Sequence, residues 1–394
     1  MPGAPGLGYR HRQYFSELVR RGWHVDVVAA NVNYMTGETP EAYVRRPLTR
    51  QVIDGIVHHF VWALPKMHES RLRRVLNYLS FAATGTLRAG TLRRPDVIIA
   101  SSPPLSVATV GAFLSARFRV PWILEIRDPW PEGAVAAGWL SADSSAYRLI
   151  SWLSRHYEST AHAVLLPTPG LADDVTAHGA RRVEVITGVV ADRQVDEDVR
   201  RRMREQLSAG DRCVFTYVGA HGVANGLDTI LDAAKDVPPE HALFVLVGEG
   251  SDRDRLQRRA RQEALPHVVM LDAVARERVD DFLAASDVCL HVLRPDPLFS
   301  YALPNKILSY FEAHRPFVTN VAGLPERLAR ESGGAYCPSA HDMADELRRW
   351  VALSPAERRQ RGEQAFVYGR EHFQFETNAD RLEGLLEDLV AGRS

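Results

Sequence analysis

The chain has 394 residues, 45% of them apolar and 25% charged, which is an ordinary globular balance in a chain too long for one hydrophobic core. Its net charge of −1 excludes a general attraction to nucleic acid or to an anionic membrane, so such binding needs a local patch. Three widely separated cysteines argue against a disulfide framework or a zinc site, and no apolar run is long enough to span a membrane. We therefore expect a cytoplasmic protein that binds no nucleic acid.

Both halves of the chain alternate short apolar runs with longer amphipathic segments. In the first half, the runs that predict buried strands of a parallel sheet are 24–30, 96–101, 122–128 and 163–168. The helical patterns between them include 9–22 and 71–90. In the second half, the predicted strands are 214–220, 243–250, 268–273, 288–293 and 316–322, and the predicted helices include 226–237, 251–262 and 279–287.

This alternation predicts two doubly wound α/β domains. We place the first at residues 1–190, the second at 191–370, and a C-terminal helix at 371–394. The chain opens with a loop that runs straight into a helix, whereas a doubly wound domain normally starts with a strand. From this we expect a truncated chain, or a start codon assigned too far downstream, with the first strand of the first domain missing.

Two turns of the second half combine small residues with a following helix. After the strand that ends near Val218, the loop 219–226 exposes backbone N–H groups at a helix start, an arrangement that favours phosphate. His221 and Asn225 could donate hydrogen bonds there, or could merely shape the turn. The second turn holds Gly248, Glu249 and Gly250; Glu249 could accept hydrogen bonds from a nucleoside or could simply favour the helix start.

Lys306 is unusual because only three of the 48 basic residues are lysines. Pro304 fixes a bend before it, and we expect Asn305 to cap a helix that begins at Lys306 or Ile307. An ammonium in the first turn of a helix is destabilised by the helix dipole unless an anion is bound there. We therefore favour a phosphate-binding lysine over the alternative, a solvated surface lysine.

In the first half, the strand 122–128 ends in the charged residues Arg127 and Asp128, and Glu132 follows closely. Ligands of parallel sheets bind beyond the carboxyl ends of the strands, so these side chains could line a site. A structural pair of Arg127 with Asp128 is an equally good account. No nucleotide-binding P-loop, dinucleotide fingerprint or metal motif is present in the sequence.

Taken in order, these motifs resemble those of retaining glycosyltransferases of the GT-B fold, specifically family 4 and its bacterial branch that transfers N-acetylated amino sugars. The segments that carry the resemblance are 127–132, 219–234, 248–256, 303–306, 311–316 and 370–389. Family resemblance implies two Rossmann-like domains facing across a cleft, with a C-terminal helix that crosses back to the first domain. It also implies a UDP-sugar donor as substrate, no cofactor and no required metal.

Residue roles follow from the same resemblance. Gly222 and neighbouring amides would meet the donor diphosphate, and Lys306 would neutralise its charge. Gly248–Gly250 and the segment that starts at Asp272 would flank the base. Asp128, Arg127 and Glu132 would face the reacting sugar or the acceptor.

One departure from the family pattern concerns the donor ribose. Many members carry an E-x(7)-E motif, but the corresponding positions here are Tyr301 and Ser309. Ser309 could still bind a ribose hydroxyl, more weakly than a carboxylate would. Glu312, nearly one turn on, could substitute.

The expected activity is transfer of an N-acetylhexosamine from UDP-sugar to an acceptor hydroxyl. The alternatives are an epimerase of the same fold and a degenerate partner protein that binds nucleotide without turnover. The segment 67–90 mixes arginines with Leu, Tyr and Phe, so it could lie on an anionic membrane and reach a lipid-linked acceptor. Its other interpretation is a helix packed on the first sheet, with a small-molecule natural product as acceptor.

Overall fold

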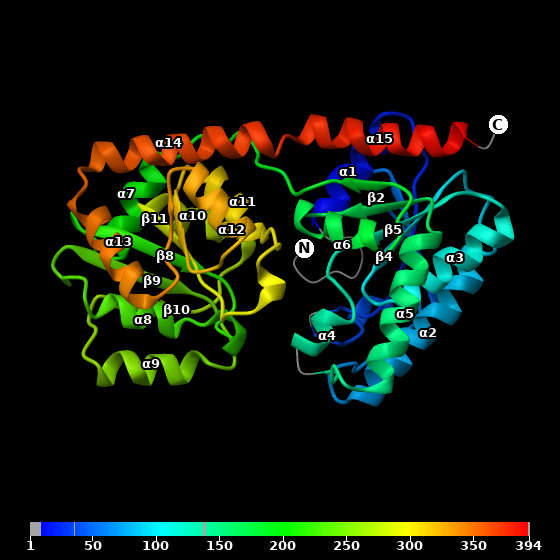
Figure 1. Ribbon diagram of the computed structural model, residues 1–394, viewed down its shortest axis with the longest axis horizontal. Coiled ribbons are helices and arrows are strands. Elements are labelled where there is room, and N and C mark those ends of the chain that lie inside the picture. Colours follow the sequence, from blue (N-terminus) through cyan, green and yellow to red (C-terminus); the bar gives the residue numbers. More distant parts are fainter. Residues whose placement is uncertain (1–8, 35, 137–138, 393–394) are drawn as a thin grey trace. The chain divides into compact units, whose positions relative to one another are not determined.

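The structure is a computed structural model that describes residues 9–34, 36–136 and 139–392. It contains two compact units, described here one at a time (Figure 1). Unit 1 comprises Met1–Thr187 together with Glu376–Ser394, and unit 2 comprises Gly188–Phe375. The sequence analysis placed its domain boundaries at 190/191 and 370/371, and these units divide at 187/188 and 375/376.

Unit 1 contains two sheets rather than the one expected. In the first, β3 (Ile56–Val61) pairs parallel with β1 (Asp26–Ala30) and antiparallel with β2 (Leu48–Ile53). The second is parallel throughout, in the order β4 (Ile98–Ser102), β5 (Trp122–Ile126), β6 (Ala163–Leu166) and β7 (Val183–Val185). Within the described residues no strand joins β1 to β4, so the sheet is interrupted at that point.

The β2–β3 hairpin is an addition that the sequence analysis missed. Its turn is Asp54–Gly55, with φ of 53° and 78°, and two consecutive residues at positive φ match the twist of a tight hairpin. β3 is buried along its whole length although it contains His58 and His59.

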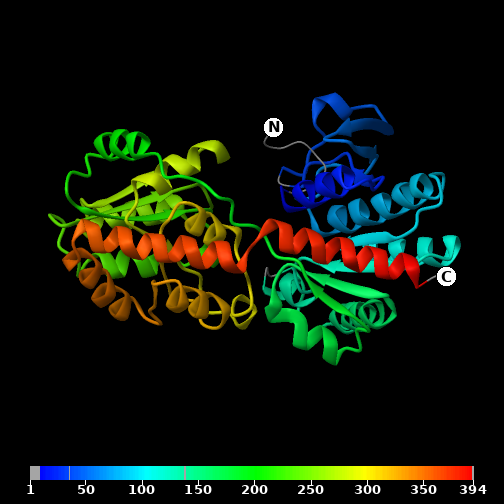
Figure 2. The same cartoon turned by 90° about the horizontal axis from the view of Figure 1, so that it is seen from above.

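Helices of unit 1 pack around these sheets. They are α1 (Tyr9–Arg20), α2 (Arg71–Ala89), α3 (Ser106–Phe118), α4 (Glu132–Ala136), α5 (Ser145–Thr160), α6 (Ala172–Ala177) and α15 (Phe375–Ala391), with short 3-10 turns η1 (Glu41–Tyr43) and η2 (Pro169–Leu171). The C-terminal helix α15 returns to unit 1 as expected, and Figure 2 shows it in red along this unit. Glu383 on α15 accepts hydrogen bonds from Arg21 at 2.6 Å and from Trp23 at 3.0 Å, which fixes the helix against the segment after α1.

Unit 2 is one parallel six-stranded sheet. Its strand order is β10 (Val268–Leu271), β9 (Ala242–Val247), β8 (Cys213–Val218), β11 (Val288–His291), β12 (Phe317–Thr319) and β13 (Ala335–Tyr336). Its helices and 3-10 turns are α7 (Glu197–Gln206), η3 (Val223–Asn225), α8 (Asp228–Ala234), α9 (Arg253–Gln262), α10 (Arg276–Ala285), η4 (Pro297–Phe299), α11 (Asn305–Glu312), α12 (Leu324–Glu331), α13 (Ala340–Ala352) and α14 (Pro355–His372). All five strands predicted for this half are present, and β13 is an addition.

The chain order of these strands reverses at β8. The chain moves outward from β8 to β9 and β10, then returns to β11 on the other side of β8. In open α/β sheets, ligands bind in the crevice beyond the carboxyl ends of the strands at such a reversal.

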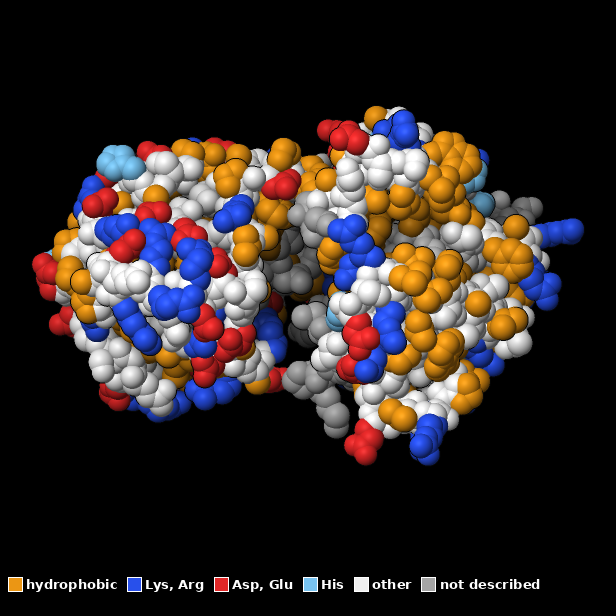
Figure 3. Space-filling view, turned by 90° about the horizontal axis from the view of Figure 1, so that it is seen from below, with side chains coloured by type: hydrophobic (Ala, Val, Ile, Leu, Met, Phe, Trp, Pro, Cys, Tyr) orange, Lys and Arg blue, Asp and Glu red, His pale blue; other side chains and the backbone are white. Residues whose placement is uncertain are grey.

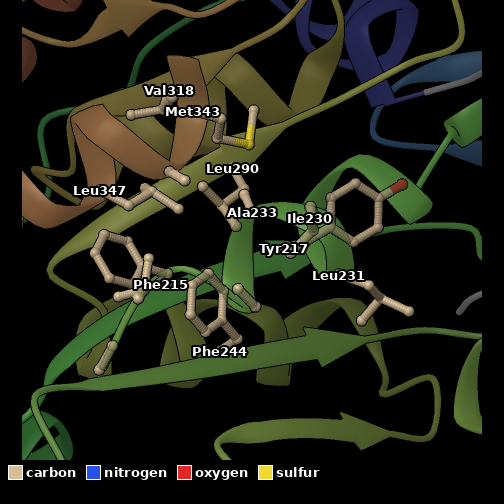
Figure 4. Packing of buried hydrophobic residues seen from close by; sticks show 14 of the residues in the cluster. Phe215, Tyr217, Ile230, Leu231, Ala233, Phe244, Leu290, Val318, Met343 and Leu347 are labelled. Atoms are coloured by element: carbon tan, nitrogen blue, oxygen red, sulfur yellow. The ribbon is translucent and has the colours of Figure 1, made fainter. Parts of the chain in front are cut away.

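The core of unit 2 holds this sheet edge in position. Phe215 and Phe244 stack across β8 and β9 with ring centres 5.1 Å apart, and Figure 4 shows them packed among the buried side chains of the neighbouring helices. Tyr217 belongs to the same cluster and is the second-last residue of β8. Its ring is therefore anchored in the core while its hydroxyl reaches the loop described next.

Candidate functional site

Two loops meet at the carboxyl ends of β8 and β9. The strands run parallel with Val218 opposite Val247, so Gly219 and Gly248 follow at the same level. The Gly219 amide donates to the Val247 carbonyl at 3.0 Å, and both glycines have positive φ, of 154° and 153°. The two loops therefore leave the sheet side by side.

Close backbone contact makes glycine necessary at this junction. A Cβ at Gly248 would lie 1.9 Å from the Gly219 carbonyl oxygen, and one at Gly250 would lie 2.4 Å from the His221 carbonyl carbon. Any side chain there would collide with backbone rather than with a movable group. The small residues noted in the sequence thus allow the two loops to pack together.

Lys306 reaches this junction from the first turn of α11. Its Nζ donates to the Tyr217 hydroxyl at 3.2 Å and lies 4.3 Å from the centre of the Tyr217 ring. A Cβ at Gly219 would be 2.9 Å from the same Nζ. The ammonium therefore lies directly against the loop 219–226 that follows β8, which we call the β8 loop. Tyr217 therefore holds the Lys306 ammonium beside this loop, and the phosphate-binding role of Lys306 stays a prediction.

The ammonium of Lys306 has no anionic partner in the part of the chain that the structure describes. None of the ion pairs of residues 9–34, 36–136 and 139–392 involves it, whereas Lys235 of the same unit pairs with Asp232 and Glu263. Burial lowers the pKa of Lys306 to about 8, because the charged form loses solvation that no carboxylate replaces. A bound anion would supply the missing interaction.

Tyr217 and Asn225 complete the wall of the β8 loop. The Tyr217 hydroxyl lies 2.9 Å from the Ala220 carbonyl and 3.0 Å from Asn225 Oδ1, and burial raises the pKa of Tyr217. Asn225 thus shapes the turn, which was one of its two sequence-based interpretations. The sequence analysis did not single out Tyr217, because an apolar strand position gave no sign of a polar role.

His221 is turned into the protein rather than toward solvent. Its side chain is fully buried, and neither ring nitrogen has a hydrogen-bond partner among the described residues. Burial and the charges of Arg253 and Lys306 lower the pKa of His221 to about 4, so the ring is neutral near pH 7. Its backbone joins the loops, since the amide donates to the Glu249 carbonyl at 2.8 Å and the carbonyl accepts from Asp252 at 2.9 Å.

The expected capping role of Asn305 is wrong. Helix α11 begins at Asn305 itself, its N-cap is Pro304, and no side chain caps it. Proline has no side-chain acceptor, and although the Ile307 amide donates to the Pro304 carbonyl at 3.0 Å, the amide of Lys306 has no partner among the described residues. The amides of Ala220, Gly222 and Gly250 are likewise unbonded within that part of the chain.

Glu249 and Asp272 converge on one arginine. Arg253, the first residue of α9, contacts Asp272 and lies 3.5 Å from Glu249 Oε1. Both carboxylates are mostly exposed, and the guanidinium ties the ends of β9 and β10 together. Arg253 is another residue that the sequence analysis did not single out.

The position of the absent ribose-binding glutamate is held by a different pair. Arg276, the first residue of α10, donates to Ser309 Oγ at 3.1 Å, so an arginine side chain lies over this position. Glu312 is directed elsewhere, because its Oε1 accepts from the backbone amide of Ala191 at 3.0 Å. Burial raises the pKa of Glu312, and its carboxylate fixes the start of the segment after β7. It is therefore not placed to substitute for the missing glutamate.

In unit 1, the residues after β5 do not form the Arg–Asp pair considered above. Arg127 donates to the Pro103 carbonyl at 3.0 Å, and the Asp128 side chain is exposed without a bonded partner among the described residues. Glu132 accepts a hydrogen bond from Tyr147 at 3.2 Å. The structure thus orients Arg127 and Glu132 and leaves the Asp128 carboxylate available.

A buried carboxylate lies at the end of the same strand. Glu125 is fully buried and contacts both Arg10 and His11 of α1, with His11 Nε2 donating at 2.6 Å. Burial and the charges of Arg10 and Arg127 lower the pKa of His11 to about 3, so a neutral imidazole makes this bond. The start of α1 is thereby fixed to the carboxyl end of β5. Arg10 and His11 gave no motif by which the sequence could have revealed them.

Chemically, the site of unit 2 can bind an anion with several oxygen atoms. It presents the unpaired ammonium of Lys306, the open amides of two glycine-rich loops and the start of α11, all at the point where the strand order reverses. Backbone donors and a helix start with a lysine are a common solution for phosphate. No cluster of His, Cys, Asp and Glu suited to a metal ion occurs in the described residues.

Family models match both halves of the chain. A family model described as a glycosyl transferase 4-like domain matches residues 6–187, and one described as glycosyl transferases group 1 matches residues 212–352. The probable glycosyltransferase WbjE of Pseudomonas aeruginosa is 25% identical over 313 residues, which is 75% of this chain and 76% of that protein.

Two solved structures share the fold. Sucrose-phosphate synthase from Thermosynechococcus elongatus has a TM-score of 0.73 and 18% identity, over 97% of this chain and 92% of that chain. Anabaena HepE, crystallised in complex with UDP, has a TM-score of 0.67 and 16% identity, over 85% of this chain and 87% of that chain. With a 4-like domain in unit 1, a group 1 domain in unit 2 and the two parallel α/β units of the GT-B fold, the chain belongs to the GT-B glycosyltransferases.

Proposed function

We propose that this glycosyltransferase moves a sugar, an N-acetylhexosamine, from a UDP-sugar to an acceptor hydroxyl with retention of the anomeric configuration. One observation carries the proposal: the Lys306 ammonium lies against the β8 loop without any carboxylate partner among the described residues. A donor diphosphate would pair with it and accept from the open amides nearby. The UDP bound in crystals of HepE supports UDP as the nucleotide of the donor.

In the proposed reaction, the bond between the anomeric carbon and the diphosphate oxygen breaks. The acceptor oxygen forms its bond to the same carbon from the same face, and its proton passes to the departing diphosphate. Lys306 and the amides of Ala220, Gly222 and Gly250 would stabilise the negative charge that develops on that leaving group. Because these donors are fixed by the sheet and by α11, little reorganisation accompanies the step.

Unit 1 would supply the acceptor side of the reaction. The exposed carboxylate of Asp128 would orient the acceptor hydroxyl or the sugar, with Arg127 and Glu132 held on either side of it by their own hydrogen bonds. We propose a lipid-linked saccharide as acceptor, because unit 1 carries an apolar and basic surface described below. This places the enzyme at the inner face of the membrane as a peripheral protein.

Positive charge at the diphosphate would come from Lys306, so we propose that no metal ion and no cofactor are required. UDP-sugar turnover should therefore survive excess EDTA, with purified enzyme re-assayed after addition of magnesium as the comparison. Loss of turnover in EDTA that magnesium restores would contradict this part of the proposal.

The donor site is tested by thermal shift with UDP, GDP, ADP and dTDP on the wild type, Lys306→Ala and Lys235→Ala. A ligand at a hundred times its Kd stabilises by about 2.7 kcal/mol, which moves the midpoint of a unit this size by several degrees. We expect a shift selective for UDP, retained in Lys235→Ala and lost in Lys306→Ala. Equal UDP shifts in both variants would refute the role of Lys306.

The activity itself is tested by NMR with UDP-N-acetylhexosamines, with and without a polyprenyl-diphosphate saccharide acceptor. Transfer with an unchanged anomeric configuration is the expected result. Conversion of the UDP-sugar without any acceptor would instead identify an epimerase. UDP binding without either reaction would identify a catalytically degenerate partner protein.

A further inference from the structure

Helix α2 of unit 1 has its apolar side chains on the outside. After its first residue, every exposed position of this 19-residue helix is Leu, Val or Ala, and these positions are Leu72, Val75, Leu76, Leu79, Ala83 and Leu87. Leu72, Leu79 and Leu87 are 68%, 57% and 72% exposed. Their spacing of three and four residues makes one continuous stripe along the helix.

The inner side of α2 is the more polar one. Asn77 is buried and donates to the Leu64 carbonyl at 2.6 Å, while Thr84 donates to the Trp62 carbonyl at 2.7 Å. Gly85 lies against Phe81 and Val28. The two fully buried residues of the helix, Asn77 and Gly85, are thus polar or small, whereas its most exposed side chains are apolar.

Neighbouring helices extend the same apolar surface. Helix α3 packs against both α2 and α5, and it exposes Phe113, while α5 exposes Leu149 and Trp152, the latter at 61%. Figure 3 shows hydrophobic side chains gathered on one face of unit 1. We call the exposed side of these helices, with its members Leu72, Val75, Leu76, Leu79, Leu87, Phe113, Leu149 and Trp152, the α2–α3–α5 face.

The charge of these three helices is one-sided. They contain seven arginines, which are Arg71, Arg73, Arg74, Arg88, Arg117, Arg148 and Arg155, and a single acidic residue, Glu158. Glu158 is buried and bonded to Ser154 and His178, so it offers no negative charge to the surface. Arg74 lies 4.0 Å from the centre of the Trp139 ring, so this arginine stacks on an aromatic side chain.

We propose that the α2–α3–α5 face docks on an anionic lipid bilayer. Exposed leucines with a tryptophan would enter the boundary between headgroups and acyl chains, and the exposed Arg148 and Arg155 would pair with lipid phosphates. The local excess of arginine in a chain of net charge −1 selects an anionic surface as the complementary partner. A second copy of this chain fits less well, because a two-fold contact would bring the same arginines together.

This docking would bring unit 1 to a lipid-linked acceptor, but it does not depend on the donor site. Among the described residues no helix is both long enough and apolar enough to cross a bilayer. The face lies on unit 1, and the UDP contacts proposed above belong to unit 2, so the two proposals can fail separately.

Sedimentation with large unilamellar vesicles tests the inference on the full chain. We compare vesicles of phosphatidylcholine alone with vesicles that contain phosphatidylglycerol, at low and at high salt. One variant carries Leu72→Gln, Leu79→Gln and Trp152→Gln, and a second carries Arg148→Gln and Arg155→Gln. Val367→Gln and Arg258→Gln, on exposed residues of unit 2, are the matched controls.

The wild type should sediment with the anionic vesicles and much less with the neutral ones. Each arginine removed should lower the partition coefficient about fivefold, and the apolar variant should lower it roughly tenfold or more. The controls should bind as the wild type does, and all variants should keep the wild-type UDP shift and circular dichroism. The inference is overturned if the wild type ignores anionic vesicles, if neither variant weakens binding, or if the apolar variant instead abolishes a dimer.

Discussion

Replacing Lys306 by methionine separates the function of this residue from its effect on stability. Methionine keeps most of the side-chain volume and its packing against Tyr217, but it removes the charge that lies without a partner at the β8 loop. We expect the variant to lose UDP binding and yet to be more stable than the wild type at pH 7. A residue retained for its ligand should have this signature, since its charge is costly until the ligand arrives.

The magnitude follows from the pKa. Burial lowers the pKa of Lys306 from 10.5 to about 8, and one unit corresponds to about 1.36 kcal/mol, so the desolvated charge costs up to about 3 kcal/mol below pH 8. The side chain keeps some contact with water, which reduces the figure to between about 1 and 3 kcal/mol. For a unit of this size the variant should melt several degrees higher, at about 2–4 °C for each kcal/mol.

The pH dependence gives the sign. Between pH 8 and 10.5 the unfolded lysine keeps its proton while the folded one loses it, so wild-type stability rises with pH across this window. The gap between variant and wild type should therefore be full below pH 8 and should close toward pH 10.5. UDP affinity of the wild type should fall over the same range, because the neutral amine no longer attracts the diphosphate.

Differential scanning fluorimetry at pH 7 and at pH 9.5, with and without UDP, measures all of these quantities. Lys235→Met is the matched control, since Lys235 is exposed and paired with Asp232 and Glu263. It should not stabilise the chain and should leave the UDP shift intact. The reasoning fails if Lys306→Met melts at or below the wild-type temperature at pH 7, or if its advantage does not shrink at pH 9.5.

Further substitutions test the packing of the site. Gly248→Ala should abolish UDP binding and lower the melting temperature, because its Cβ would collide with backbone. The control Gly384→Ala on α15 has open space and should be neutral or stabilising by up to about 1 kcal/mol. Equal behaviour of the two variants would contradict the loop packing. If residue 309 contacts the donor ribose, Ser309→Glu should tighten UDP binding about fivefold in calorimetry. The double variant with Arg276→Gln should bind UDP more tightly still, because it removes the competing guanidinium. No gain in either variant would argue against a ribose at this position. Glu125→Gln should lower the free energy of unfolding in urea by roughly 3 kcal/mol, because it leaves Arg10 and His11 of α1 without their buried carboxylate. An unchanged urea midpoint would contradict that pairing.

Several features of the site could be read from the sequence because they depend on near neighbours. A run of apolar residues followed by small residues and an amphipathic segment encodes strand, turn and helix locally. This pattern located both glycine-rich loops of unit 2. Lys306 was recognisable from the scarcity of lysine and its place after Pro304. The Asp54–Gly55 pair is typical of a tight hairpin turn between β2 and β3. The strand after it was missed because two histidines interrupt the apolar run of β3.

Other features depend on which distant segments the sheet order brings together. Lys306 and Tyr217 are 89 residues apart, and Arg10 and Glu125 are 115 apart, so neither pair leaves a local trace. The same holds for Glu312, whose carboxylate could have met a ribose but bonds to Ala191, and for Ser309, which only the fold places beside Arg276. Asn305 failed as a cap because the helix starts one residue earlier than its local pattern indicated.

The sequence by itself determined the two α/β units and the glycine turns and singled out Lys306, since hydrophobic period and turn chemistry are properties of short segments. Only the tertiary structure decided which side of a helix or loop is exposed to solvent. The apolar side of α2 reads as a core stripe in sequence, yet the inward hydrogen bonds of Asn77 and Thr84 direct it outward. Likewise, His221 reads as a ligand-binding side chain, but the close contact of two glycine loops buries it beneath them. In both cases the deciding interactions join segments that the sequence keeps apart.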